Sequence, residues 1–302
     1  MKQPNLFDVI IIGGSYAGLS AAMALGRSLR NILVIDSGKP CNEQTPHSQN
    51  FLTQDGKTPK EISTLAKSQV EEYDTVEFCD GKAVSAQKTD FGFEITTENG
   101  ERFSSKKLIV ATGIIDEIPD IKGFQESWGI SLIHCPYCHG YEYKGKKTGI
   151  IANGDKAVHI SSLVKNLTED VTILTRGKAQ FTPEQSEKLK NNQIEIIETE
   201  ISELKNENGY VKSIVFNSGK EINFEAVYGA FPFQQHSDIP KNLGCEFTEF
   251  GHIKTDQFQK TNVPGLFVCG DNSSMMRSVS NAVMTGNVAG AMVNMELVTD
   301  CF

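Results

Sequence analysis

The sequence has no apolar run long enough to span a membrane, and it has no excess of basic residues. Its most apolar helical stretch, residues 281–298, is interrupted by Asn287 and Asn294. Asp and Glu number 38 against 29 Lys and Arg, which gives a formal net charge of −9. Nucleic acid and anionic lipid repel a chain of this charge, so we expect neither nucleic acid nor a membrane as a partner.

The cysteines do not form the framework of a secreted disulfide scaffold. There are seven of them, an odd number, and their spacing follows no paired pattern. The N-terminus runs directly into a strand-like segment, without the features of a signal peptide. We therefore expect a cytoplasmic protein with mostly reduced thiols and one redox-active pair.

What the chain does contain is enough apolar sequence for two domains. It has 302 residues, of which 39% are hydrophobic and 22% are charged, as in ordinary globular proteins. The only internal repeat is a second copy of a strand-helix-strand plan. We expect two domains of ordinary size, each with its own core.

Cys135 and Cys138 form a C-x-x-C motif, with His134 before it and His139 after it. Two thiols at this spacing can open and close a disulfide. A thiolate at a helix N-terminus near a protonated imidazole is stabilised, which makes it a better nucleophile and leaving group. The motif thus indicates thiol-disulfide chemistry.

Three other interpretations fit the same residues. C-x-x-C-H is also the attachment pattern of c-type haem, which needs an export route and a second axial ligand. The two histidines and two cysteines could hold zinc, although structural zinc generally takes two ligand pairs separated by a loop. The cysteines could also be two buried structural thiols.

The N-terminal segment has the pattern of a dinucleotide-binding unit. Residues 7–12 are apolar and β-branched, like a buried parallel strand, and a helical pattern follows the glycine turn. A second strand, residues 31–35, leads to Asp36, where an acid can take a ribose hydroxyl. Ser15 replaces the middle glycine of G-x-G-x-x-G and still lets a pyrophosphate approach the helix N-terminus. The turn consists of Gly13, Gly14, Ser15, Tyr16, Ala17 and Gly18.

Two further segments resemble parts of FAD-binding proteins. Residues 261–271 contain a turn, a short strand and a Gly-Asp pair, similar to the flavoprotein segment in which the Asp binds the ribityl and pyrophosphate region. An Ala-Thr-Gly segment after the strand at 107–110 resembles the companion signal. The two ends of the chain would then form one FAD domain split by an insertion. The residues concerned are Ala111, Thr112, Gly113, Gly270 and Asp271.

The order of these motifs resembles that of low-molecular-weight thioredoxin reductases over nearly the whole chain. The resemblance implies an α/β fold of two doubly wound Rossmann-like domains, the second inserted into the first. It assigns residues 1–116 and 241–302 to a discontinuous FAD-binding domain. It assigns residues 117–240 to an NAD(P)H-binding-like domain that carries the C-x-x-C pair. It also implies a homodimer.

The same resemblance implies roles for single residues. Cys138 is similar to the thiol that touches the isoalloxazine, and Cys135 to the thiol that attacks the substrate disulfide. His139 stands where the family has an Asp as proton donor; it can act as an acid or base near neutral pH or pack at a helix start. A segment opening the last helix matches the one that presents backbone donors to the flavin, although it also fits an ordinary basic helix start. This segment is Arg277, Ser278 and Val279.

The second nucleotide loop departs from the family pattern. Ala152 replaces the first glycine of G-x-G-x-x-A and adds a Cβ where the turn is tightest. Residues Thr175, Arg176 and Gly177 stand where the family has a His-Arg-Arg cluster for the 2′-phosphate of NADPH. NADPH use is therefore left open.

From these patterns we predict an FAD-dependent thiol-disulfide oxidoreductase of the thioredoxin reductase type, with no metal ligands. The expected partner is a thioredoxin-like protein or a small dithiol or disulfide. The sequence also resembles dithiol oxidases of the gliotoxin type, which pass electrons to oxygen, and ferredoxin-linked reductases that do not use pyridine nucleotide. A flavin redox sensor without turnover is the non-enzymatic alternative.

Overall fold

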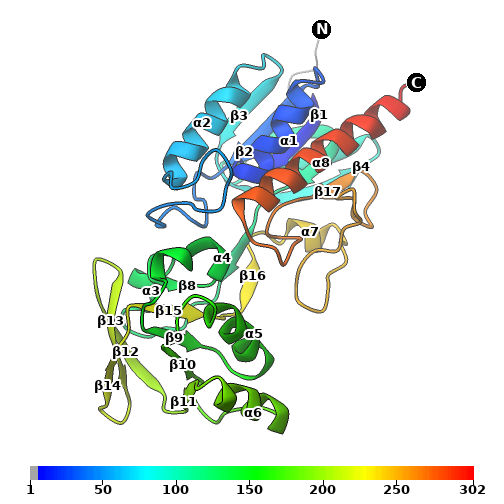
Figure 1. The fold of residues 1–302 in the computed structure, drawn as a ribbon. Helices are drawn as coiled ribbons and strands as arrows, with labels where there is room; N and C mark the ends of the chain where they lie inside the picture. The colour runs from blue at the N-terminus through cyan, green and yellow to red at the C-terminus, as the bar shows by residue number, and fades with distance from the viewer. Residues whose placement is uncertain (1–5) are drawn as a thin grey trace. The chain divides into compact units, whose positions relative to one another are not determined.

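The computed structural model describes residues 6–302, which form two compact units (Figure 1). The first unit takes in the chain up to Glu43, Phe51–Ile115 and Phe233–Phe302, and the second comprises Gln44–Asn50 and Asp116–Pro232. Each unit contains a largely parallel sheet with helices packed on it. This confirms the predicted α/β fold, in which one Rossmann-like unit is inserted into the other.

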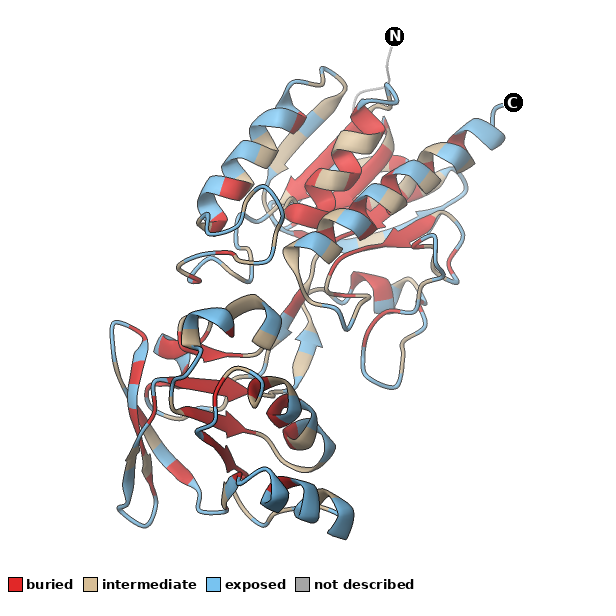
Figure 2. Cartoon of the chain, viewed as in Figure 1, coloured by how far each residue is buried: buried red, intermediate tan, exposed pale blue. Residues whose placement is uncertain are grey.

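The sheet of the first unit is parallel at its centre, and its central strands are buried. Its strands are β1 (Leu6–Ile12), β2 (Ile32–Asp36), β3 (Val76–Asp80), β4 (Ala83–Thr89), β5 (Gly92–Thr97), β6 (Arg102–Val110) and β17 (Leu266–Val268). The order is β3-β2-β1-β6-β5-β4, and β17 also pairs with β6. Only the β4-β5 and β5-β6 pairs are antiparallel. In β1, Val9, Ile10 and Ile11 are fully buried, as continuous apolar runs in parallel sheets generally are (Figure 2).

Three helices of the first unit, α1 (Tyr16–Gly26), α2 (Pro59–Glu71) and α8 (Val279–Thr299), lie side by side on one face of this sheet (Figure 1). α1 and α8 approach closely because small residues face each other. A Cβ on Gly286 of α8 would collide with the carbonyl oxygen of Ala17 in α1. The small residues thus fix α8 against the start of α1.

The second unit contains two sheets. The parallel one has the order β11-β10-β9-β15-β8, and the antiparallel one has the order β12-β13-β14. The strands are β8 (Leu132–Ile133), β9 (Thr148–Ile151), β10 (Val171–Leu174), β11 (Glu195–Ile197), β12 (Ile201–Glu207), β13 (Tyr210–Phe216), β14 (Glu221–Asn223) and β15 (Ala226–Gly229). The helices are α3 (Phe124–Ser127), α4 (Pro136–His139), η1 (Tyr141–Tyr143), α5 (Gly154–Val164) and α6 (Pro183–Asn191).

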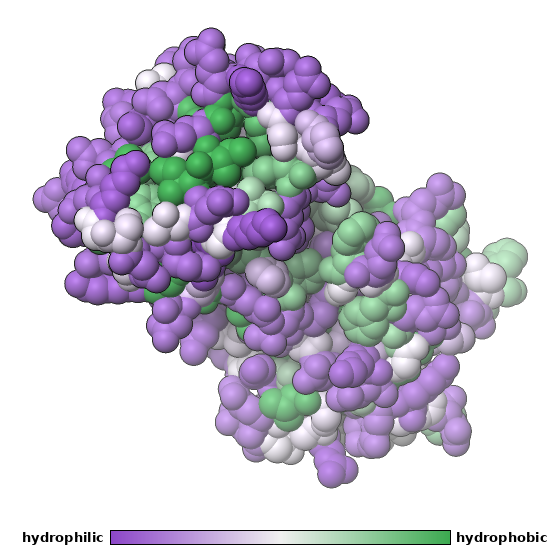
Figure 3. Space-filling view, turned by 90° about the horizontal axis from the view of Figure 1, so that it is seen from below, coloured by the Kyte–Doolittle hydropathy of each residue, from purple (hydrophilic) through white to green (hydrophobic). Residues whose placement is uncertain are grey.

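The remaining elements are short. β7 (Ile114–Asp116) pairs with β16 (Phe233–Gln235), and α7 (Ile239–Asn242) follows. Within residues 6–302, no helix combines the length and the apolar character needed to cross a membrane. Figure 3 shows a face of the molecule on which hydrophilic side chains predominate around smaller apolar areas.

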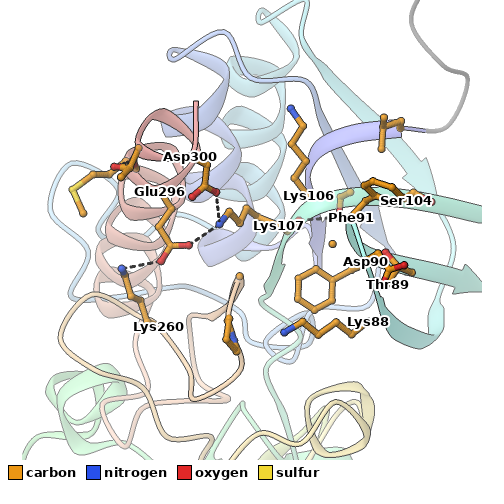
Figure 4. A pocket seen from close by; sticks show the side chains of 18 residues that line it. Lys88, Thr89, Asp90, Phe91, Ser104, Lys106, Lys107, Lys260, Glu296 and Asp300 are labelled. Carbon is orange, nitrogen blue, oxygen red and sulfur yellow. Dashed lines mark hydrogen bonds and ion pairs between the residues drawn. The ribbon is translucent and has the colours of Figure 1, made fainter. Parts of the chain in front are cut away.

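An ion-pair network ties the end of α8 to β6. Lys107 Nζ lies 3.0 Å from Glu296 Oε2 and 2.9 Å from Asp300 Oδ2, and Lys260 Nζ lies 2.8 Å from Glu296 Oε1. These side chains form one wall of a pocket of about 1290 Å³ (Figure 4). The pocket is lined by the first residue of β1 and the residue before β17, so it lies at the amino-terminal edge of the sheet. None of the predicted site residues lines it.

Candidate active site

Four parallel strands of the first unit end at the same edge of the sheet. The register pairs Ile12 of β1 with Ile35 of β2 and with Val110 of β6, and it pairs Val110 with Val268 of β17. Open parallel sheets bind ligands at the edge formed by the carboxyl ends of their strands. The predicted cofactor residues at or just beyond these ends are Gly13, Asp36, Ala111 and Gly270.

The glycines of the turn after β1 have no room for a side chain. Gly13 has a φ of +103°, and a Cβ there would collide with the carbonyl of Ala111. A Cβ on Gly14 would lie 2.8 Å from the Cβ of Asp36, and one on Gly18 would collide with the carbonyl oxygen of Gly13. The backbone N–H of Gly14 donates to Asp36 Oδ1 at 3.0 Å. The turn after β1 and the acid that ends β2 are therefore joined directly.

The start of α1 is open to an anion. Ser15 is the N-cap, and its side chain makes no capping hydrogen bond. The first turn contains no acidic residue, so the partial positive charge of the helix N-terminus is not neutralised by its own sequence. Ala17 lies where Gly270, with a φ of +89°, and Gly286 come close to α1. A larger side chain than alanine would not fit there.

Two buried polar atoms at this edge have no hydrogen-bond partner within the described part of the chain. They are Thr112 Oγ1 and Asn272 Oδ1. Asn272 is fully buried, and its Nδ2 donates to the carbonyl oxygen of Val110 at 3.1 Å. The N–H of Gly270 donates to Thr285 Oγ1 at 3.1 Å. Buried polar atoms normally find partners, so the two unpaired oxygens point to a bound polar group.

The remaining predicted cofactor residues also belong to the first unit. Arg277 Nε lies 3.8 Å from Asp271 Oδ2. Ser278 is the N-cap of α8, whose first residue is Val279, and the Ser278 side chain accepts a hydrogen bond from a backbone N–H within the first turn. Gly113 has a φ of +66° and open space around its Cα.

Taken together, this edge fits the diphosphate and ribose of a dinucleotide such as FAD. Gly13 and Gly14 carry no side chain, so a ligand can approach the backbone of the turn after β1. The N-terminus of α1 favours negative charge, and the carboxylate of Asp36 stands at the end of β2, where a ribose hydroxyl can donate to it.

Cys135 and Cys138 are joined by a disulfide in the second unit. Cys135 is the N-cap of α4, and Pro136 is its first residue, a position at which the fixed φ of proline suits a helix. The backbone N–H of Cys138 donates to Cys135 Sγ at 3.1 Å. Both cysteines are half-buried, whereas Tyr137 between them is exposed. The pair is thus held at a helix start on an accessible part of the chain.

His139 ends α4 with both ring nitrogens buried. Within the described residues, neither nitrogen has a hydrogen-bond partner. Burial lowers the pKa of His139 below the ordinary 6.5, so the ring is neutral at pH 7. The next residue, Gly140, fixes this end of α4, because a Cβ there would collide with the side chain of Leu167. A neutral imidazole with a free nitrogen can accept a proton.

The disulfide bears on the zinc and haem interpretations. In the oxidised pair each sulfur is bonded to the other, so neither can bind a metal while the disulfide is closed. Among residues 6–302, no group of three or more His, Cys, Asp or Glu side chains is arranged to hold a metal ion.

Three polar residues that support these arrangements were not identified by the sequence analysis. Asn272 and Thr285 support the Gly270 turn, and Asn153 bridges two loops of the second unit. Asn272 carries a weak signal, because it directly follows the Gly-Asp pair. The hydrogen bonds of Thr285 and Asn153 join residues far apart in sequence, so no local sequence pattern indicates them.

Comparison with known proteins places these features in a family. Residues 7–286 match the family model described as pyridine nucleotide-disulphide oxidoreductase. The thioredoxin reductase tcpT of Claviceps purpurea is 34% identical, covering 99% of this chain and 97% of that protein. The thioredoxin reductase aclD of Aspergillus oryzae is 31% identical, covering 98% of each.

The crystal structure of an oxidoreductase from Agrobacterium tumefaciens is 37% identical in sequence. It superposes with a TM-score of 0.90 and covers 97% of this chain and 99% of that chain. The matched length, the two Rossmann-like units and the C-x-x-C disulfide agree, and the chain belongs to the pyridine nucleotide-disulphide oxidoreductase family.

Proposed function

We propose that this chain is an FAD-dependent thiol-disulfide oxidoreductase of the thioredoxin reductase type, which exchanges electrons with a partner through Cys135 and Cys138. The observation that carries the proposal is the disulfide at the start of α4, in a unit inserted into a dinucleotide-binding fold. Relatives named thioredoxin reductases, similar over nearly their whole length, support it.

We assign the FAD-binding domain to residues 1–116 and 241–302, and residues 117–240 carry the cysteines. The compact first unit differs from this assignment in taking in residues 233–240 and in leaving out residues 44–50. The backbone of the glycine turn and the N-terminus of α1 would hold the diphosphate, and Asp36 would accept a hydrogen bond from a ribose hydroxyl. Thr112 and Asn272 offer the unpaired oxygens. When bound, FAD supplies the two-electron oxidation or reduction of the cysteine pair.

Exchange with a partner dithiol proceeds through a mixed disulfide at Cys135. A partner thiolate attacks Cys135 Sγ; a new S–S bond forms, the Cys135–Cys138 bond breaks, and Cys138 leaves as a thiolate. The second partner thiol then attacks the partner sulfur of the mixed disulfide, and Cys135 leaves as a thiolate. The partner loses two electrons and two protons, and the cysteine pair gains the electrons. The reverse sequence reduces a partner disulfide.

His139 accepts or returns a proton in these steps. Its ring is neutral at pH 7 because of burial, and it directly follows Cys138 in the chain. A neutral imidazole takes the proton of an incoming thiol and returns it to a leaving thiolate. The fold thus places a base beside the pair without an acidic residue.

The partner is a thioredoxin-like protein or a small dithiol or disulfide. The exposed Tyr137 lies between the half-buried cysteines and the exposed Tyr141 follows them in the chain, so an approaching partner meets aromatic side chains. Cys79, Cys245, Cys269 and Cys301 are free thiols, which suits a reducing compartment, and we place the protein in the cytoplasm.

The proposed assembly is a homodimer through the outer face of α8. Exposed positions along this helix form one stripe at a spacing of three and four residues. The only charged residue in α8 is Glu296, which pairs with Lys107 and Lys260. Two chains with a net charge of −9 each can meet along such an uncharged face without like-charge contacts. The stripe consists of Ser280, Met284, Asn287, Ala291, Met295 and Val298.

An anaerobic titration of the purified flavoprotein with dithiothreitol tests the function. We expect bleaching of the flavin by the dithiol and many turnovers per protein when an oxidant is supplied. Cys135→Ser abolishes both, whereas Cys301→Ser, which removes an exposed thiol outside the pair, leaves both unchanged. Turnover by the Cys135→Ser protein would overturn the mechanism, and bleaching without turnover would instead indicate a redox sensor.

A further inference from the structure

The second unit has its own pair of loops at the carboxyl ends of parallel strands. The register pairs Ile151 at the end of β9 with Leu174 at the end of β10. The loops that follow these strands lead to α5 and α6, which lie near each other in Figure 1. In doubly wound folds a dinucleotide lies across such neighbouring loops, with its diphosphate on the first helix and its adenosine ribose beside the second strand.

The side chain of Asn153 joins these two loops directly. Its Nδ2 donates to the carbonyl oxygen of Lys178 at 2.9 Å, and its Oδ1 accepts from the N–H of Gln180 at 2.8 Å. The same oxygen accepts from the N–H of Gly154, the first residue of α5, at 2.9 Å. One side chain therefore ties the loops together and occupies a backbone donor that a diphosphate would use.

Further bonds hold the second loop in the same place. Gln185 at the start of α6 donates to Asp155 in the first turn of α5 at 2.6 Å. Glu198 Oε1 accepts from the N–H of Ala179 at 2.6 Å. The loop is thus bonded on one side to the α5 start and on the other to the residue after β11.

The charge at this edge does not favour a phosphate. Asp155 lies in the first turn of α5, where a carboxylate competes with an anion for the helix N-terminus. Arg176, which stands in the position expected to meet a 2′-phosphate, has its Nε 3.8 Å from Glu200 Oε2. Glu198 and Glu200 are both exposed beside this loop. This edge therefore has no excess of positive charge to attract a nucleotide phosphate, because its three carboxylates stand against Lys156, Arg176 and Lys178.

We propose that Asn153 closes the adenylate site of the second unit, so that neither NADPH nor NADH is the reductant of this protein. The inference rests on the proposed thiol-disulfide function and narrows its electron source to something other than a nicotinamide. Asn153 is then a specificity-determining residue: its three hydrogen bonds stand where the diphosphate and ribose of a nicotinamide dinucleotide would lie.

Calorimetric titration of the holoprotein with 2′,5′-ADP tests the closure, because this probe reports the adenylate site without any redox step. For the unaltered protein we expect no saturable binding up to about 1 mM. Asn153→Gly removes all three bonds, and the double variant with Ala152→Gly also restores the glycine turn. We expect these variants to bind with a dissociation constant about tenfold below that limit or lower. Asn192→Gly, the same substitution at the end of α6, is the matched control and stays without binding.

Binding by the unaltered protein, or rapid bleaching of its flavin by NADPH, would overturn the inference. Failure of both Asn153 variants to bind would overturn the role of Asn153; intact flavin and circular dichroism spectra establish that they are folded. Dithiothreitol titration of the same preparations separates this inference from the proposed function. Bleaching by the dithiol together with bleaching by NADPH would remove the inference alone, whereas no response to the dithiol would remove the proposed function.

Discussion

The backbone N–H of Cys138 points at the sulfur of Cys135, with a separation of 3.1 Å. Cys135 is the N-cap of α4, and this hydrogen bond belongs to the helix start. A donor aimed at a sulfur stabilises its thiolate more than its thiol. This bond supports the thiolate of Cys135, and we predict that Cys135 is the more readily ionised cysteine of the pair.

A single-cysteine series tests this asymmetry. In Cys138→Ser we expect the remaining thiol of Cys135 to have a pKa below the usual value of about 8.5 and to form a stable mixed disulfide with a small disulfide probe. In Cys135→Ser we expect slow reaction of Cys138. The measurement is the pH dependence of alkylation, followed by mass spectrometry. Equal rates in the two variants would contradict the asymmetry.

The burial of His139 leads to a prediction for the acid limb of the pH–rate profile, the range in which the rate falls as the pH is lowered. Burial lowers its pKa below 6.5, so the ring is a neutral base at pH 7 and gains a proton only as the pH falls further. The rate of dithiol oxidation should therefore decline below pH 6.5 and stay flat just above it. His139→Asn should slow the reaction about 100-fold and flatten that limb.

A variant with a carboxylate at position 139 is the control for His139→Asn, because it keeps a titratable group there. His139→Asp should recover part of the rate and change the acid limb, since the group that titrates is then a carboxyl whose pKa burial raises above the ordinary value of about 4. A pH profile of His139→Asn with the same acid limb as the unaltered protein would show that another group titrates.

Several features were predictable because their signals are local. The run at 7–12 became β1, and the acid after the second apolar run lies at the end of β2, bonded to Gly14. The start of α6 at Pro183 has a signal of the same local kind, because Thr182 and Gln185 form a capping box around it.

Other features depend on contacts between distant residues. Gln44 falls in the second unit, and its Nε2 donates to the carbonyl oxygen of Trp128, 84 residues away. The bonds of Asn153 reach 25 and 27 residues along the chain. The sequence pointed to Ala152 as the departure in this loop, whereas the bonds that join the loops belong to its neighbour. Such pairings leave no periodic pattern to read.

Gly18→Ala tests whether the turn after β1 and the start of α1 form the diphosphate site. The added Cβ would collide with the carbonyl oxygen of Gly13, so the turn after β1 must shift. We expect a protein with little bound FAD, judged from the ratio of flavin to protein absorbance, and a loss of stability of about 2 kcal/mol. Gly149→Ala is the matched control, because its Cβ would make ordinary contacts at 3.4 Å with Leu174 and Phe224. Full flavin content in Gly18→Ala would refute this placement.

The ion-pair network at the end of α8 should stabilise the fold only over a limited pH range. Burial alone would raise the pKa of Glu296, but the bonds from Lys260 and Lys107 outweigh it, and the pKa falls below 4.5. Burial alone would lower the pKa of Lys107, but its bonds to Asp300 and Glu296 raise the pKa above 10.5. The Glu296 contribution is full above pH 4.5 and is lost as the pH falls through the folded-state pKa. The Lys107 contribution is full below pH 10.5 and is lost at higher pH.

Urea unfolding of Glu296→Gln tests the acid side of this window. At pH 7 the variant should be less stable by about 1 kcal/mol, and the difference should shrink at a pH well below 4.5, because the carboxylate of the unaltered protein gains a proton as the pH falls through its lowered pKa. Glu184→Gln, which breaks a fully exposed pair with Lys188, is the control and should change stability little. An equal loss for Glu296→Gln at both pH values would show that the ion pairs are not its cause.

The proposed dimer face on α8 makes the last prediction. Met284 and Met295 are half-exposed on the uncharged side of α8, so a charge placed there would sit inside the interface without a partner. Met284→Glu should convert the dimer to a monomer in sedimentation at micromolar concentration while leaving the flavin spectrum unchanged. Leu65→Glu places the same charge on an exposed apolar position of α2 and should leave the dimer intact. If Met284→Glu sediments as the unaltered protein does, the outer face of α8 is not the contact between the copies, because a buried unpaired carboxylate could not leave the association unchanged.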